Sequence, residues 1–297
     1  MEFLWFLEGL RTPLFDKVMQ AVTYFGQELI VIAVICALYW CADKQFAYLI
    51  GFSYFSAGLC VQALKITFRI PRPWILDPAF KPVESAVAGA TGYSFPSGHT
   101  QSAVSLFFPI ALRLSRIWQK CLCVLCFLLI GFSRMYLGCH TPQDVLVSMA
   151  VSILLSCLVW RLQKYLIGQT THLRLIAVIL ALCSLAAALY SFLLFRNGTI
   201  EAEYAADCFK AAGAGLGFAA GWYMERKYLD FRTDGFRLPG QFIKLFLGLA
   251  VALLIKECAS LLLGSSVLAK MAEYFILVLW VLGIYPFLFS KLRRRTA

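Results

Sequence analysis

The sequence predicts an all-α protein: a polytopic membrane helical bundle of about nine transmembrane helices with an interfacial N-terminal helix. Two features of composition lead to this prediction, since apolar residues make up 61% of the 297 residues and charged residues only 14%. Such a chain has too little polar surface to cover a soluble globule, so the bilayer must be its solvent. The third observation is that the apolar residues fall into stretches long enough, or nearly long enough, to span a bilayer.

The expected spans follow one another along the whole chain. The third and fourth are short, which suits tilted helices or helices shielded by neighbours. Within the seventh, glycines recur every four residues, a spacing that favours close packing against another helix. The nine expected spans are Val22–Cys41, Phe46–Leu64, His99–Leu112, Trp118–Phe132, Asp144–Trp160, Leu175–Phe195, Ala205–Met224, Phe242–Leu263 and Met271–Leu288.

The segment Met1–Gln20 mixes Phe and Leu side chains with charged ones. This pattern suits a helix lying in the membrane interface, and the alternative is a frayed start to the first span. The segment lacks the basic start and clean apolar core that are typical of a cleavable signal peptide.

The net charge of +11 raises the question of nucleic-acid binding. The basic residues, however, occur in short runs between apolar stretches, where they set membrane orientation and meet anionic lipid. Because no basic face with interleaved aromatic residues stands out, we expect no nucleic-acid partner. The 11 cysteines are scattered and mostly lie within apolar stretches, so we interpret them as packing residues rather than metal ligands.

The longest early polar segment, Ile66–Pro96, contains four prolines before its small-residue stretch. A long structured loop between spans is more often functional than not. Lys65 directly precedes this segment, and Arg72 lies between two prolines that fix the local backbone and help to aim the guanidinium. The alternative is a lysine and an arginine that snorkel at a membrane end.

The residues Ser97, Gly98 and His99 stand immediately before an apolar helix. Ser97 is a favourable N-cap, and Gly98 lets the backbone approach a ligand closely. Free amide groups at a helix start form an anion site. The alternative is an ordinary capped turn.

His140 and Asp144 are four residues apart where the fifth span begins, with Thr141 and Pro142 expected as its N-cap and first residue. The carboxylate can therefore reach the imidazole, which is the orienting pair that a histidine nucleophile needs. The alternative is an ion pair at a helix end. Because two spans separate this region from the proline-rich loop, both regions face the same side of the membrane.

Here the residues carry a family resemblance. The sequences KITFRIPRP, PSGH and SRMYLGCHTPQD resemble the three motifs of the type 2 phosphatidic acid phosphatase superfamily. The resemblance extends from Lys65 to Asp144, and three motifs in order at the correct spacing are specific. The nine-span layout is similar to that of glucose-6-phosphatase and the sphingoid-base phosphate phosphatases, by analogy only.

The resemblance implies metal-independent hydrolysis of a phosphomonoester or diphosphate on a membrane lipid: phosphatidic acid, an isoprenyl phosphate or a sphingoid-base phosphate. His140 would attack phosphorus to form a phosphohistidine. Asp144 would orient His140, while His99 would protonate the leaving oxygen and then activate water.

Five further residues would bind the substrate phosphate. Lys65, Arg72 and Arg134 would neutralise the phosphoryl oxygens, and Ser97 with the amide of Gly98 would add hydrogen bonds. Three cations take the part that a metal plays elsewhere, so no cofactor and no metal are expected. The alternatives are a sugar-phosphate phosphatase similar to glucose-6-phosphatase, a lipid phosphotransferase and a lipid-phosphate binder or transporter.

Residues 1–170 are expected to form the phosphatase core, and residues 171–297 additional transmembrane helices. Basic residues near spans accumulate on the cytoplasmic side. They gather after the third, fifth and seventh expected spans and in the carboxyl-terminal tail. We therefore expect the amino terminus and the active site outside the cytoplasm and the carboxyl terminus inside it.

Overall fold

The structure is a computed structural model that describes residues 1–233 and 238–296, with side chains described as far as Lys291. The described residues form helices and contain no strand, which confirms the all-α prediction. The topology prediction partly rests on Arg237 and on the side chains of Arg293, Arg294 and Arg295, which lie outside what the structure describes.

The chain divides into two compact units, each of which contains two segments of sequence. The first unit comprises Met1–Ile32 and Cys60–Leu158, and the second comprises Ala33–Leu59 and Val159–Ala297. The helices in chain order are α1 (Glu2–Gly9), α2 (Pro13–Tyr24), α3 (Glu28–Ala37), η1 (Leu38–Ala42), α4 (Lys44–Phe68), α5 (Pro73–Leu76), α6 (Glu84–Val87), α7 (Gly98–Arg113), α8 (Ile117–Tyr136), α9 (Pro142–Arg161), η2 (Lys164–Gly168), α10 (Leu173–Arg196), α11 (Ala202–Met224), η3 (Glu225–Leu229), α12 (Leu238–Leu263), α13 (Val267–Leu279), η4 (Trp280–Ile284) and α14 (Tyr285–Thr296).

Side-chain caps explain where the helices of the first unit begin. Ser97 is the N-cap of α7, as predicted, and its Oγ accepts from the amide of Thr100 at 3.4 Å. Pro142 opens α9, also as predicted, and the amide of Asp144 donates to Oγ1 of Thr141 at 3.4 Å. Both caps satisfy amide groups that a helix start leaves without a backbone partner.

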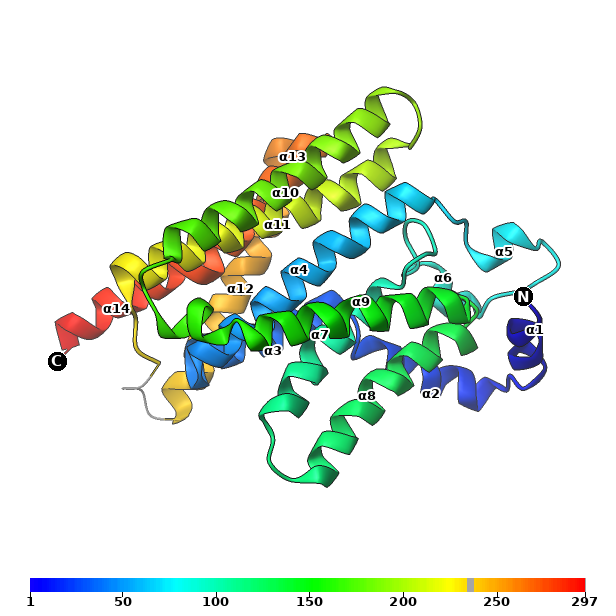
Figure 1. Cartoon of the computed structure of the whole chain (residues 1–297), viewed down its shortest axis with the longest axis horizontal. Coiled ribbons are helices and arrows are strands. Elements are labelled where there is room, and N and C mark those ends of the chain that lie inside the picture. The colour runs from blue at the N-terminus through cyan, green and yellow to red at the C-terminus, as the bar shows by residue number, and fades with distance from the viewer. Residues whose placement is uncertain (234–237, 297) are drawn as a thin grey trace. The chain divides into compact units, whose positions relative to one another are not determined.

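The core of the first unit lies between α7, α8 and α9. The helices α7 and α8 form a hairpin, visible in the lower part of Figure 1, and α2 packs against α8. A Cβ atom added at Gly131 of α8 would lie 2.9 Å from Cγ1 of Val145, so α8 and α9 approach each other closely at this glycine. The buried apolar residues of this core are Ala103, Val104, Phe127, Ile130, Val145 and Met149.

The second unit is built on α10, α11 and α13, of which α10 and α11 form the long hairpin in Figure 1. The glycines of α11 at four-residue spacing face α13. A Cβ atom at Gly213 would lie 2.1 Å from the carbonyl oxygen of Met271, and one at Gly217 would lie 2.7 Å from that of Phe275. Only residues without a side chain allow two helix backbones to approach this closely.

The structure does not confirm the exact count of nine spans. Among the described residues, six helical segments are long and apolar enough to cross a bilayer, or seven if α2 and α3 with η1, bent by 43°, form one span. The 16 residues of α7 reach about 24 Å, which is shorter than a bilayer core. The Gly- and Ala-rich α11 offers little apolar surface, and it carries Glu203, Asp207 and Lys210.

The N-terminal region also differs from the single interfacial helix that was expected. It forms two helices, because Thr12 caps a new helix that begins at Pro13.

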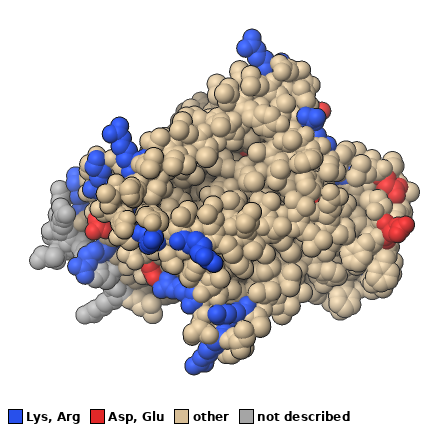
Figure 2. All heavy atoms as spheres, viewed as in Figure 1, with Lys and Arg blue, Asp and Glu red and all other residues tan. Residues whose placement is uncertain are grey.

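Most residues on the face shown in Figure 2 are uncharged, and the Lys and Arg residues occur in several separate groups. One such group lies at the turn between α7 and α8, at the bottom of Figures 1 and 2.

Candidate active site

The predicted site residues all belong to the first unit, where four segments meet. Lys65 lies in the last turn of α4, and Arg72 is the N-cap of α5. The start of α7 supplies Ser97, Gly98 and His99, and the end of α8 with the start of α9 supplies the remainder. Backbone hydrogen bonds fix these segments to one another: the amide of Ser97 donates to the carbonyl oxygen of Asp144 at 3.1 Å. The eight residues are Lys65, Arg72, Ser97, Gly98, His99, Arg134, His140 and Asp144.

His140 and Asp144 form the pair that the sequence predicts. Both side chains are buried, and Nδ1 of His140 lies 3.4 Å from Oδ2 of Asp144. Nδ1 makes no aligned hydrogen bond among the described residues, so the contact is electrostatic in this arrangement. Catalytic hydrogen bonds are often long before substrate binds and tighten in the reactive complex.

Asp144 is itself held in place by two hydrogen bonds to its Oδ2. The hydroxyl of Ser94 donates to it at 2.5 Å, and the amide of Thr141 donates to it at 2.8 Å. Ser94 lies outside the three sequence motifs and was missed by the sequence analysis. Its only sequence signal is its position two residues before Pro96, and nothing in the local pattern indicates a carboxylate partner.

Arg72 contacts the other nitrogen of the His140 ring. Nη1 of Arg72 lies 2.9 Å from Nε2 of His140 and 3.1 Å from the carbonyl oxygen of Cys139. A guanidinium can only donate, so Nε2 must accept and the ring proton must lie on Nδ1, facing Asp144. The remaining donors of Arg72 bind the carbonyl oxygens of Thr91 and Gly92.

His140 is held in its neutral form. Burial, followed by the positive charges of Arg72, Arg134 and Lys65, lowers the pKa of His140 well below its usual range. A neutral imidazole with an unprotonated Nε2 is the form that attacks an electrophile.

Arg134 is also buried, with 2% of its surface exposed. Its Nη1 donates to Oγ1 of Thr23 at 3.1 Å. Its Nε and Nη2 are buried and have no acceptor among the described residues. Buried donors are nearly always paired, so these two indicate an acceptor from outside the described residues.

The remaining predicted residues surround the start of α7. Lys65 is buried, and its Nζ donates to the carbonyl oxygen of Tyr93 at 2.5 Å. The hydroxyl oxygen of Ser97 caps α7, while a Cβ atom added at Gly98 would meet no atom within 4 Å. Open space therefore lies beside the first amide groups of this helix, which is the arrangement of an anion site. His99 is half-buried.

Two family models match this chain. Residues 46–167, which contain all eight predicted site residues, match the PAP2 superfamily. Residues 209–296 match the transmembrane extension of PAP2 superfamily phosphatases. The chain belongs to the PAP2 superfamily. This confirms the resemblance to the type 2 phosphatidic acid phosphatase superfamily. The match to the transmembrane extension, together with the apolar helices, shows that the PAP2 protein is an integral membrane protein.

Two curated proteins resemble this PAP2 chain. Undecaprenyl-diphosphatase BcrC of Bacillus subtilis is 34% identical over 112 residues, which is 37% of this chain. Dihydrosphingosine 1-phosphate phosphatase YSR3 of Saccharomyces cerevisiae is 23% identical over 290 residues, which is 90% of this chain. The PAP2 chain covers 54% of the length of the bacterial protein and 66% of the yeast protein.

Among solved structures, Aquifex aeolicus LpxE matches this PAP2 protein with a TM-score of 0.46 and 25% identity, over 54% of this chain and 93% of that one.

Within the described residues, no group of three or more His, Cys, Asp or Glu side chains is arranged to hold a metal ion.

Proposed function

We propose that this PAP2 protein hydrolyses a phosphomonoester or diphosphate on a membrane lipid through a phosphohistidine at His140, without a metal. The observation that carries the proposal is that Nε and Nη2 of Arg134 are buried and lack acceptors among the described residues. Phosphoryl oxygens are acceptors that match a guanidinium in charge and geometry. The carbonyl oxygen of Arg134 also accepts from the amide of His140 at 3.3 Å, so the cation and the nucleophile belong to one turn of chain.

The proposed reaction has two steps. Nε2 of His140 attacks phosphorus, the bond from phosphorus to the leaving oxygen breaks, and His99 donates a proton to that oxygen. His99 then takes a proton from water, whose oxygen attacks phosphorus, and the bond between phosphorus and Nε2 breaks. Asp144 stabilises the positive charge that the ring carries between the two steps, and the clustered cations stabilise the charge on phosphorus.

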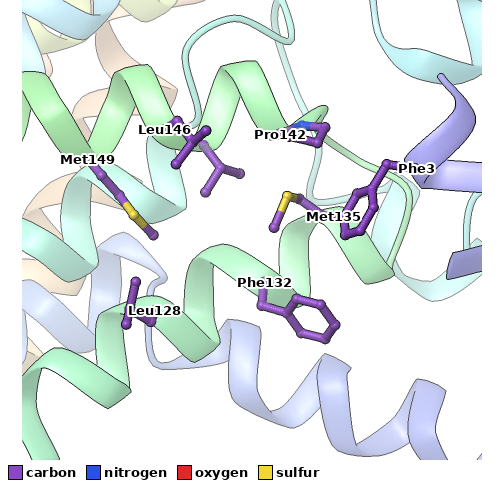
Figure 3. A pocket seen from close by; sticks show the side chains of 8 residues that line it. Phe3, Leu128, Phe132, Met135, Pro142, Leu146 and Met149 are labelled. Atoms are coloured by element: carbon purple, nitrogen blue, oxygen red, sulfur yellow. The ribbon is translucent and has the colours of Figure 1, made fainter.

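A lipid substrate is supported by an apolar pocket of about 390 Å³ in the first unit (Figure 3). The pocket lies between α8 and α9, and Phe3 of α1 closes one end of it. Met135 and Val145 line it, and each directly follows a predicted site residue in the chain. We assign this pocket to the hydrocarbon chain of the substrate. A sugar phosphate would have no use for such a lining, and the names of both curated relatives specify lipid phosphates.

We propose that residues 1–170 carry out the chemistry and that residues 171–297 are additional membrane helices. We also propose that the amino terminus and the active site lie outside the cytoplasm and the carboxyl terminus inside it. Arg113, Arg116 and Lys120 support this orientation, because they flank the turn between α7 and α8, at the opposite helix ends from His99 and Arg134.

The experiment is phosphate release by the purified protein from phosphatidic acid, an isoprenyl diphosphate, a sphingoid-base phosphate and glucose 6-phosphate. Each assay is run after dialysis against a strong chelator and again with added magnesium. We expect release from at least one lipid, independent of magnesium and inhibited by vanadate, which mimics five-coordinate phosphorus. Release from glucose 6-phosphate alone, or from no substrate without magnesium, would refute the proposal. Release only with an added alcohol acceptor would identify a phosphotransferase instead.

A further inference from the structure

The helix α2 and the turn that follows it lie outside residues 46–167, the part of the chain that matches the PAP2 superfamily, yet each of them contacts the candidate site. Thr23, in its last turn, is 1% exposed, and its Oγ1 accepts from Nη1 of Arg134 at 3.1 Å. Gly26 follows the helix, and a Cβ atom there would lie 3.0 Å from the carbonyl oxygen of His99. The N-terminal region therefore forms one wall of the site.

The other end of α2 is tied to the same turn of α8. The amide of Thr12 donates to the hydroxyl of Tyr136 at 3.3 Å, and that hydroxyl donates to Oδ1 of Asp16 at 3.1 Å. Nε of Arg11 donates to the carbonyl oxygen of Tyr136 at 3.0 Å. Because Tyr136 stands two residues after Arg134, these contacts fix the position of α2 along the very segment that carries the buried cation.

We propose that Thr23 is a positioning residue that aims Arg134 at the substrate phosphate, and that α2 is therefore part of the active site. This inference rests on the proposed function. An arginine side chain has many rotamers, and within the described residues the side chain of Arg134 forms a hydrogen bond to Thr23 alone. With Nη1 held by a stiff β-branched side chain, Nε and Nη2 keep one direction and form a preorganised fork for two phosphoryl oxygens.

A buried threonine could instead serve packing alone, so the test compares two substitutions. Thr23→Val removes the acceptor at nearly constant shape, whereas Thr23→Ser retains it. We expect Thr23→Val to lower kcat/KM and to weaken vanadate binding, each by about tenfold or more, and Thr23→Ser to restore most of both. The thermal unfolding temperatures of the two variants should be similar. Ser184→Ala is the matched control, since it removes a buried hydroxyl from α10 in the second unit.

A double-mutant cycle with Arg134→Gln separates positioning from packing. If Thr23 acts through Arg134, Thr23→Val should have little further effect on vanadate binding once the guanidinium is gone. Vanadate binding is measured by calorimetry and needs no turnover. An active protein in which Thr23→Val leaves kcat/KM and vanadate affinity unchanged would overturn the inference but not the proposed function. Equal losses in Thr23→Val and Thr23→Ser, or additive effects in the cycle, would overturn it as well. A wild-type protein without phosphate release would instead count against the proposed function.

Discussion

Nη1 of Arg72 lies 2.9 Å from Nε2 of His140, on the side of the ring opposite Asp144. In the proposed mechanism, phosphorus has to approach Nε2 along the direction that this guanidinium occupies. Arg72 must therefore exchange the ring nitrogen for a phosphoryl oxygen as the substrate binds. One arginine then both fixes the ring tautomer before binding and neutralises the phosphate afterwards.

We predict that His140→Ala abolishes phosphate release and that the protein no longer incorporates label from a ³²P-labelled substrate. The variant loses the nitrogen that forms the covalent bond, so no other residue of the site can replace it. His172→Ala is the matched control, because His172 is the exposed N-cap of α10 in the second unit and should leave both measurements unchanged. Near-normal phosphate release by folded His140→Ala would contradict the mechanism.

Asp144→Asn should lower kcat by about 10³-fold while the substrate affinity changes little. The amide keeps the shape of the carboxylate, but it cannot stabilise the positive ring that forms during the reaction. Ser94→Ala, which removes a hydrogen bond to Asp144, should lower kcat by about tenfold. Steady-state kinetics of the two single variants and of the double variant measure these losses in kcat. An unimpaired Asp144→Asn protein would show that the carboxylate serves only to begin α9.

The pH dependence follows from the lowered pKa of His140. The neutral ring is the nucleophile, so a lowered pKa keeps it reactive at pH values below about 6.5, where a free imidazole becomes protonated. We expect ¹⁵N NMR of histidine-labelled protein to show a neutral His140 ring at pH 6. Arg72→Gln removes the largest of the charge contributions to the lowered pKa of His140, so the midpoint of the His140 titration should rise towards the usual range. A His140 titration midpoint at or above pH 6.5 in the wild-type protein would contradict the electrostatic argument.

Filling the apolar pocket should discriminate between substrates by chain length. Leu146 lines the pocket in Figure 3, and Leu146→Trp should raise KM for a long-chain lipid phosphate by about tenfold. The same variant should hydrolyse a short water-soluble phosphate ester at the normal rate. Leu154→Trp is the control, because Leu154 is a similarly exposed residue of α9 that does not line the pocket. Equal effects on both substrates would remove the assignment of the pocket to the lipid chain.

The proposed orientation can be tested with single cysteines in a cysteine-free background and a membrane-impermeant thiol reagent on intact cells. Ala88→Cys places a thiol on the exposed loop after α6 and should label. Ser115→Cys places one on the exposed turn between α7 and α8 and should label only after the membrane is permeabilised. The reverse pattern would move the site to the cytoplasmic face.

The sequence motifs predicted the parts of the site that depend on local chemistry. Ser97 and Thr141 cap their helices as expected, and His140, just before α9, lies close to Asp144 in the first turn of that helix. Thr23 was missed for the opposite reason. It lies 111 residues from Arg134 in the chain, and a threonine within an apolar helix has no pattern that indicates a tertiary partner.

The number of spans was harder to predict for a related reason. Val22–Cys41 was expected to be one span, yet the structure interrupts it between Tyr24 and Glu28, where α2 and the helical segment that begins with α3 meet at a bend of 43°. At this break Gly26 packs against the backbone of His99, a contact that no hydropathy profile contains. The three motifs therefore predicted which residues lie together in the candidate site, whereas the contacts of the helices around them required the three-dimensional structure.

The contact of Gly213 with the backbone of Met271 has a consequence for saturation mutagenesis. Even alanine at this position would place a carbon 2.1 Å from a carbonyl oxygen, and moving a helix backbone to relieve it costs about 1–3 kcal/mol or more. A survey of tolerated substitutions would then find Gly213 and Gly217 to be as intolerant of substitution as His140, although neither glycine takes part in the proposed chemistry. Cellular protein level, measured alongside activity, would separate the two kinds of intolerance, since glycine variants should disappear from the membrane while His140 variants accumulate there inactive.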